Sequence, residues 1–257
     1  MRPRPSPLDI PELAERCISL LHDSYDDLVA CATVKRSWTY FAQSYLFKDV
    51  GLSIEDGSCA RLLDVFTDSP HLIRFVLRMN VWVEFMSPEE FAALAALPFL
   101  NIRVLHICSR REPSSQAATA IQQFLALPRL EYVKLKYTLR DLDQFERTLE
   151  RASPSIKHLL LCLESTQGSP ALVFPSPKTR TTTTQTRMQI SSLRMVGDST
   201  FLRWLATGRS AIDLSRLRTL DLRGCDSTIL CTPAFASAAA GLEVLHVDCF
   251  IVPHEPC

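Results

Sequence analysis

Apolar residues recur through most of this chain in a six-position frame, Leu-x-x-Leu-x-Leu, in which other aliphatic residues can replace leucine. The frame starts at residues 72, 102, 130, 156, 217 and 242, and a partial copy starts at 193. Short segments with alternating apolar positions are typical of half-buried β-strands. Intervals of 24 to 30 residues, with one of 37, leave room for a helical or irregular return. The pattern therefore predicts an α/β fold with parallel strands.

Two of the segments between these frames have the periodicity of amphipathic helices. They are residues 87–97 (SPEEFAALAAL) and 115–127 (SQAATAIQQFLAL), and each begins with serine, a residue that favours helix N-termini. The interval is close to that of leucine-rich repeats, in which each repeat is a short strand followed by a helical or irregular return. We expect an irregular leucine-rich-repeat solenoid over residues 51–257. The alternative is an ordinary α/β core with alternating strands and helices.

The first fifty residues have a helical pattern instead. Three short helices are predicted, with capping residues Asp9, Ser24 and Ser37. In the third, apolar residues fall at i, i+3, i+4, i+7 and i+8 counted from Trp38, which is the spacing of one helix face. A unit of this size buries too little surface to be stable alone. Part of its apolar surface should therefore contact a partner or the rest of the chain.

Residues 8–50 resemble the F-box, a helical module with spaced Leu or Ile positions and a stretch similar to "VCRSW" before its last helix. The segment that corresponds to that stretch here is VKRSW, in which Lys35 replaces the common Cys. The matching residues are Ile10, Pro11, Leu13, Ile18, Leu21, Leu28, Ala30, Cys31, Val34, Arg36, Ser37, Trp38, Leu46 and Phe47. With the repeats behind it, the chain is similar to fungal F-box proteins with degenerate leucine-rich repeats.

This resemblance implies that the helices bind a Skp-type adaptor, and through it a cullin, in an SCF-type ubiquitin ligase. The chain would then be a non-catalytic subunit that recognises a protein substrate. The implied adaptor-binding residues are Ile10, Pro11, Leu13, Cys17, Leu21, Leu28, Cys31, Val34, Trp38, Leu46 and Phe47. Two alternatives stay open: the helices could simply cap the solenoid, and the whole chain could be a leucine-rich scaffold with no ubiquitin-ligase role.

The side chains between the leucines of each frame should face the open side of the sheet, because side chains alternate along a strand. The expected substrate-binding residues are Arg74, Arg78, His106, Tyr132, Lys134, Lys136, Asp221 and Arg223. The early strands present mainly cations, which suggests an acidic or phosphorylated protein segment as the substrate. The alternative is a solvated face with no ligand. Residues 1–7 are expected to be disordered, and the Pro/Thr-rich segment 166–189 a flexible insertion.

The amino-acid composition limits the classes of partner and of catalytic chemistry that the chain is expected to have. Lys+Arg and Asp+Glu both number 28, so no net positive field favours nucleic acid or a membrane surface. Nine cysteines without a CxxC pair, and no signal peptide or apolar span, predict a cytoplasmic and/or nuclear protein. The motifs GxSxG, HExxH, GxxxxGK[ST] and GxGxxG do not occur. We therefore predict no catalytic residue, metal or cofactor, and a hydrolase remains a remote alternative.

Overall fold

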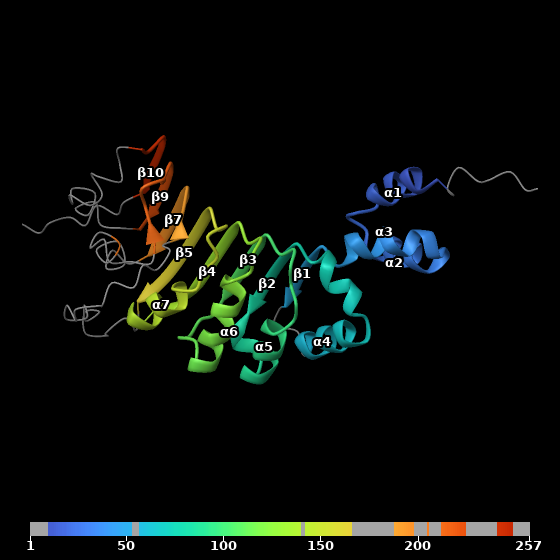
Figure 1. The fold of residues 1–257 in the computed structure, drawn as a ribbon, viewed down its shortest axis with the longest axis horizontal. Coiled ribbons are helices and arrows are strands. Elements are labelled where there is room, and N and C mark those ends of the chain that lie inside the picture. The colour runs from blue at the N-terminus through green and yellow to red at the C-terminus, as the bar shows by residue number, and fades with distance from the viewer. Residues whose placement is uncertain are drawn as a thin grey trace, which may run out of the picture.

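A computed structural model describes residues 10–52, 57–139, 142–165, 188–197, 205, 212–224 and 241–248. Its centre is an eight-stranded sheet in which every neighbouring pair of strands is parallel, in the order β1-β2-β3-β4-β5-β7-β9-β10 (Figure 1). The strands are β1 Asp49–Leu52, β2 Arg78–Trp82, β3 Val104–Cys108, β4 Tyr132–Leu139, β5 His158–Ser165, β7 Ser192–Gly197, β9 Thr219–Arg223 and β10 Val244–Asp248. The predicted α/β fold with parallel strands is confirmed.

A second, two-stranded parallel sheet pairs β6 (Met188–Gln189) with β8 (Ile212–Asp213). The last two residues of the expected insertion 166–189 are therefore in a strand. Residues 166–187, like the N-terminal segment 1–7, lie outside the described part of the chain.

Three helices precede the sheet: α1 Pro11–Ser19, α2 Tyr25–Val34 and α3 Arg36–Leu46. Ile18, Leu28 and Ala42 form their small buried core. The prediction of three short helices is confirmed, but Ser37 as the cap of the third is wrong. Lys35 is in extended conformation (φ −152°, ψ 137°) and both ends α2 and begins α3, so Ser37 is already inside the helix.

The described connections between β1 and β5 lie on one side of the sheet, and no described helix covers the other side of these strands (Figure 1). Their helices are α4 Ser58–Asp68, η2 Pro70–Phe75, η3 Val83–Phe85, α5 Pro88–Ala95, α6 Ser115–Leu125 and α7 Leu142–Leu149. The hydroxyl of Ser87 accepts a hydrogen bond from the backbone N–H of Glu90. In return, the Glu90 carboxylate accepts a hydrogen bond from the backbone N–H of Ser87, so the expected serine cap of α5 is a full capping box. The cap of α6 is Ser114, one residue earlier than the expected start.

The first of the predicted frames is wrong. Residues 72–77 match Leu-x-x-Leu-x-Leu, but Pro70 starts the 3₁₀-helix η2, which occupies the segment up to Phe75. The frame that forms β2 starts instead at Val76, and its apolar positions Val76, Met79 and Val81 are all buried. The partial copy at 193 likewise belongs to a full frame that starts at Ile190, which is also buried.

With these corrections, frames start at residues 47, 76, 102, 130, 156, 190, 217 and 242, and they are 25 to 29 residues apart except for one interval of 34. The frame at residue 47 supplies β1. The sequence does not predict this strand, because the frame overlaps the end of the helical module at residues 47–50. Phe47 is thus both the C-cap residue that directly follows α3 and the first residue of the first frame.

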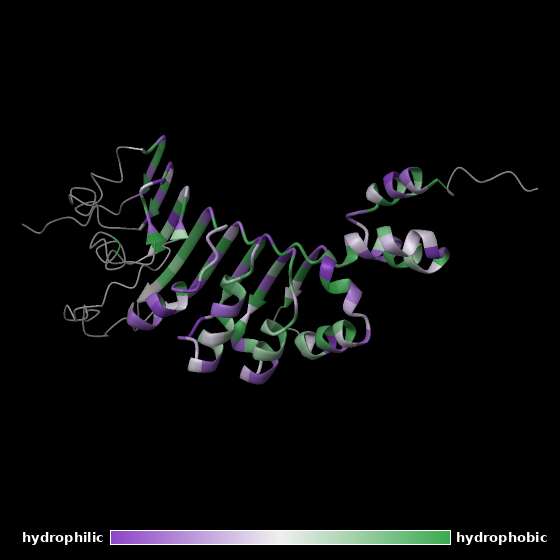
Figure 2. Ribbon diagram, in the orientation of Figure 1, coloured by the Kyte–Doolittle hydropathy of each residue, from purple (hydrophilic) through white to green (hydrophobic). Residues whose placement is uncertain are grey.

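Five phenylalanines join the first four frames through the core. Phe47 packs on Phe66 (6.2 Å between ring centroids), Phe66 on Phe99 (5.9 Å), Phe99 on Phe124 (6.3 Å) and Phe124 on Phe91 (5.7 Å). We call this run the phenylalanine spine. It lies in the apolar layer between the sheet and helices α4 to α6, and Figure 2 shows apolar residues along the strands that form that layer.

Candidate protein-binding surfaces

The open side of the sheet presents three rows of side chains, because each strand is paired in register with the next. The first row is Arg78, Val104, Tyr132, His158, Ser192, Thr219 and Val244. The second is Asn80, His106, Lys134, Leu160, Arg194, Asp221 and His246; the third is Trp82, Cys108, Lys136, Cys162, Val196, Arg223 and Asp248. Neighbouring members of a row are about 4.8 Å apart.

Seven of the eight expected substrate-binding residues lie in these rows: Arg78, His106, Tyr132, Lys134, Lys136, Asp221 and Arg223. Placing Arg74 on the sheet face is wrong, and Val76 beside it is fully buried. Arg74 belongs to η2, before the strand, because the true frame starts four residues later than the expected one. The structure thus brings most of the predicted residues onto one surface, over strands β2 to β9.

Charge is unevenly distributed along the rows. On β3, β4 and β5 the rows contain Lys134 and Lys136 and no acidic residue. On β7, β9 and β10, Asp221 lies between two arginines and a histidine: its oxygens are 3.1 Å from Arg194 Nε, 3.1 Å from Arg223 Nε and 3.3 Å from His246 Nδ1. Arg194 Nε makes no hydrogen bond, so its contact with Asp221 is ionic only. The face is therefore basic in the middle and internally neutralised towards β10.

Aromatic rings stack across the middle of the face. The rings of His106 and Tyr132 are 5.6 Å apart, and those of Tyr132 and His158 are 6.4 Å apart. Burial lowers the pKa of His106, and the positive charges of Lys134 and Arg78 lower it further. Burial raises the pKa of Tyr132. At neutral pH His106 and Tyr132 are therefore uncharged, and they lie beside Lys134 as an amphipathic pair.

The free energy of unfolding should decrease at low pH, where His106 becomes protonated. The unfolded chain binds a proton near the ordinary pKa of 6.5, whereas the folded chain does so only at lower pH. Below pH 6.5 the unfolded state therefore binds more protons, and the free energy of unfolding decreases as pH falls through that range. Urea denaturation at pH 7.5 and 5.5 should show a smaller loss for His106→Gln than for the wild type. Equal losses in the two proteins would contradict the assignment to His106.

Two buried thiols, those of Cys59 and Cys108, are not activated as nucleophiles. Burial raises the pKa of Cys108, and it raises the pKa of Cys59 in α4 to about 11. The thiolate is the reactive form of cysteine, so a raised pKa keeps these side chains unreactive near pH 7. Among the described residues there is also no group of three or more His, Cys, Asp or Glu side chains that could hold a metal ion.

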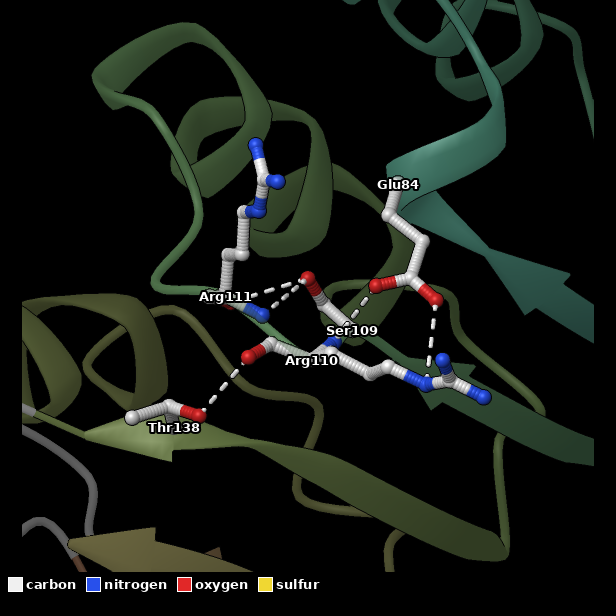
Figure 3. Close-up of polar contacts among 5 residues, drawn as sticks. All are labelled: Glu84, Ser109, Arg110, Arg111 and Thr138. Carbon is white, nitrogen blue, oxygen red and sulfur yellow. Dashed lines mark hydrogen bonds and ion pairs between the residues drawn. The ribbon is translucent and has the colours of Figure 1, made fainter. Parts of the chain in front are cut away.

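A polar cluster fixes the turn where β3 ends (Figure 3). The backbone N–H of Arg110 donates to Glu84 Oε2 (2.9 Å), and Thr138 Oγ1 donates to the carbonyl of Arg110 (2.9 Å). Ser109 Oγ donates to the carbonyl of Arg111 (2.8 Å). Arg110 Nε lies 3.7 Å from Glu84 Oε1, so this acid is already matched by a cation. The cluster holds the turn in place; Glu84 Oε1 is buried and makes no hydrogen bond, so its contact with Arg110 is ionic only.

The α1 helix has a second apolar surface beside the one it buries. Ala14 and Ile18 are buried against the other helices, and Leu21 packs against the same small core. The residues that precede them in sequence, Leu13, Cys17 and Leu20, lie about 100° round the helix and are exposed, as is Ile10 at its start. We call Ile10, Leu13, Cys17 and Leu20 the α1 stripe. On α2, Tyr25, Val29 and Val34 are exposed as well.

The expected adaptor-binding residues divide into three groups in the structure. Ile10, Pro11, Leu13, Cys17 and Val34 are exposed. Leu21, Cys31, Trp38 and Leu46 pack against the core of the three helices, and Leu28 is inside that core with 2% of its surface exposed. Phe47 packs against the core of the sheet. Leu28 therefore supports the packing of the three helices, and its role in adaptor binding stays a prediction.

Comparison with known proteins adds no identification. No protein-family model, curated protein or solved structure matches the chain. Within the described residues, no helix is both long enough and apolar enough to cross a membrane.

Proposed function

We propose that this chain is a substrate-recognition subunit of an SCF-type ubiquitin ligase. In this proposal helices α1 to α3 are an F-box that binds a Skp-type adaptor, and through it a cullin. The strands and their connections are irregular leucine-rich repeats that bind a protein substrate. Ubiquitin transfer takes place on other subunits, and the chain contributes by holding the substrate near them.

The α1 stripe is the observation that carries this proposal. Three helices that bury only a small core leave a row of apolar side chains in solvent, with Leu20 79% and Leu13 43% exposed. Burying such a row in an interface stabilises a complex through the hydrophobic effect. The residues of the α1 stripe fall within the segment whose sequence resembles the F-box. Helices that only capped the sheet would not require an exposed apolar row.

The open sheet face supports the second part of the proposal. Its rows expose residues of the kinds that bind proteins, with the rings of His106, Tyr132 and His158 beside Lys134. Frames 25 to 29 residues apart, with one interval of 34, and an all-parallel sheet support the assignment of the strands to irregular leucine-rich repeats. The basic middle of the face favours an acidic or phosphorylated substrate segment.

The test is binding of a purified Skp-type adaptor by the full chain. Leu13→Asp combined with Cys17→Asp places two carboxylates in the α1 stripe and should weaken binding by about 100-fold, equivalent to about 2.7 kcal/mol. Both positions are exposed, so the helices should stay folded. Isothermal titration calorimetry measures the affinity, and far-UV circular dichroism checks the fold.

Arg16→Asp is the matched control, because it adds a carboxylate to the polar side of the same helix. It should bind the adaptor as the wild type does. Failure of the wild-type chain to bind any Skp-type adaptor, or unchanged binding by the double variant, would favour a leucine-rich scaffold with no ubiquitin-ligase role. Leu28→Asp is unsuitable for this test, since it would disrupt the core of the three helices.

A further inference from the structure

A cavity of about 460 Å³ opens at the edge of the sheet where the strands begin, away from the open face. Its lining residues are Pro70, Ile73, Arg74, Pro98, Leu100, Asn101, Pro128 and Arg129. They come from the turns that precede β2, β3 and β4, so the cavity crosses three consecutive frames. Since neighbouring strands are about 4.8 Å apart, it extends about 10 Å across the sheet. A proline in each of the three turns gives it a rigid, apolar wall.

Asn101 organises this cavity. Its Nδ2 donates to the carbonyl oxygen of Arg74 (2.7 Å), and its Oδ1 accepts a hydrogen bond from Arg129 Nη1 (2.9 Å). One side chain thus ties together the turns before β2, β3 and β4. The turn that contains it is two residues longer than the next one, since LPFLNI at 97–102 corresponds to LPRL at 127–130. The longer turn also presents Leu100, which is 62% exposed.

Two guanidinium groups give the cavity its charge. The guanidinium carbon of Arg74 lies 5.2 Å from the ring centroid of Tyr40 and 4.9 Å from that of Phe75, so cation–π contacts hold it in place. Arg129 is oriented by Asn101. Within the described part of the chain neither arginine forms an ion pair with a carboxylate, and the lining residues include no acid. The cavity therefore has two oriented positive charges and an apolar surface between them.

We propose that this cavity binds an extended acidic peptide segment. Two of its carboxylates, three residues apart, would pair with Arg74 and Arg129, and an apolar side chain between them would rest on the exposed Leu100. The spacing follows from the geometry of an extended polyproline-II segment, in which three residues span about 9 Å and return to the same face, close to the distance across the three turns. The proposal does not depend on a role in ubiquitin ligation.

The test uses the full chain and a fluorescein-labelled peptide with the core sequence Glu-Leu-Val-Glu between glycines. Fluorescence anisotropy should show saturable binding to the wild type. Arg129→Glu should weaken it at least tenfold, and a peptide with Gln in place of both Glu residues should bind at least tenfold more weakly. Leu100→Asp, at an exposed position that folding does not need, should also weaken binding at least tenfold.

Arg216→Glu is the matched control. Arg216 occupies the same position in LSRL (214–217) that Arg129 occupies in LPRL, and it is exposed but lies before β9, outside the cavity. Its replacement should change the affinity less than twofold. No saturable binding to the wild type, or an equal loss in Arg216→Glu and Arg129→Glu, would overturn the proposal. Displacement of the peptide by millimolar inorganic phosphate would also overturn it, because the cavity would then recognise an anion alone.

Discussion

Phe124→Ala is expected to lower the free energy of unfolding by about 3–5 kcal/mol, the usual cost of removing a fully buried phenylalanine ring. Phe124 is 1% exposed, and its ring packs on both Phe91 and Phe99. Alanine would leave a cavity at the centre of the phenylalanine spine, where two rings would each lose a partner. Because the spine joins the first four frames, the loss should affect the sheet as a whole. Urea denaturation followed by far-UV circular dichroism measures it.

Phe85→Ala is the control for this prediction. Phe85 is 43% exposed and packs at 6.4 Å only on the ring of Trp82 among the aromatic contacts of the described residues. Its removal should cost less than about 1 kcal/mol. If Phe124→Ala were as mild as Phe85→Ala, the central role of the spine would be refuted.

Gly197→Ala is the second substitution expected to be strongly destabilising, by about 2–3 kcal/mol. Gly197 ends β7 with φ at +120°, a conformation that side-chain-bearing residues rarely adopt. A Cβ atom at this position would overlap the carbonyl oxygen of Leu163 in the neighbouring strand β5. Relief of the overlap requires the ends of β5 and β7 to separate. The change in the midpoint of urea denaturation reports the cost.

Gly51→Ala provides the comparison at a glycine without these constraints. Gly51 is in β1, and an added Cβ would meet no atom within 4 Å. Its backbone has no positive φ, so alanine there should be neutral or raise the free energy of unfolding by up to about 1 kcal/mol. A similar loss in both variants would show that the overlap with Leu163 is not the cause.

The repeated strands were predictable from sequence wherever one frame alone fitted the apolar pattern. The frames at 102, 130, 156 and 217 produce strands whose apolar positions are buried as expected, whereas the frame at 242 produces β10 with Leu245 and Val247 exposed. Two overlapping frames fit equally well between residues 72 and 81, and pattern alone could not choose between them. The start of a 3₁₀-helix at Pro70 decides the choice, and so does the interval to the next frame, which is 26 residues from Val76 but 30 from Leu72.

The binding surfaces were predictable only in part, for a physical reason. The helical spacing identifies the apolar residues of α1, but it does not say that Ile18 faces the small core while Leu13 and Leu20 face solvent. That division depends on how α3 packs against α1. The cavity at the start of β2 to β4 was missed because it combines residues from turns 26 to 28 positions apart. The two extra residues that place Leu100 and Asn101 in one turn were its visible signal.

The spine begins at Phe47, directly after α3, and Tyr40 of α3 packs at 5.1 Å on Phe75 in η2. The backbone N–H groups of Leu77 and Arg78 both donate to the carbonyl of Lys48. These contacts leave no free hinge between the helices and the first strands. A partner bound to the helices would therefore be held in a defined orientation relative to a ligand on the first strands.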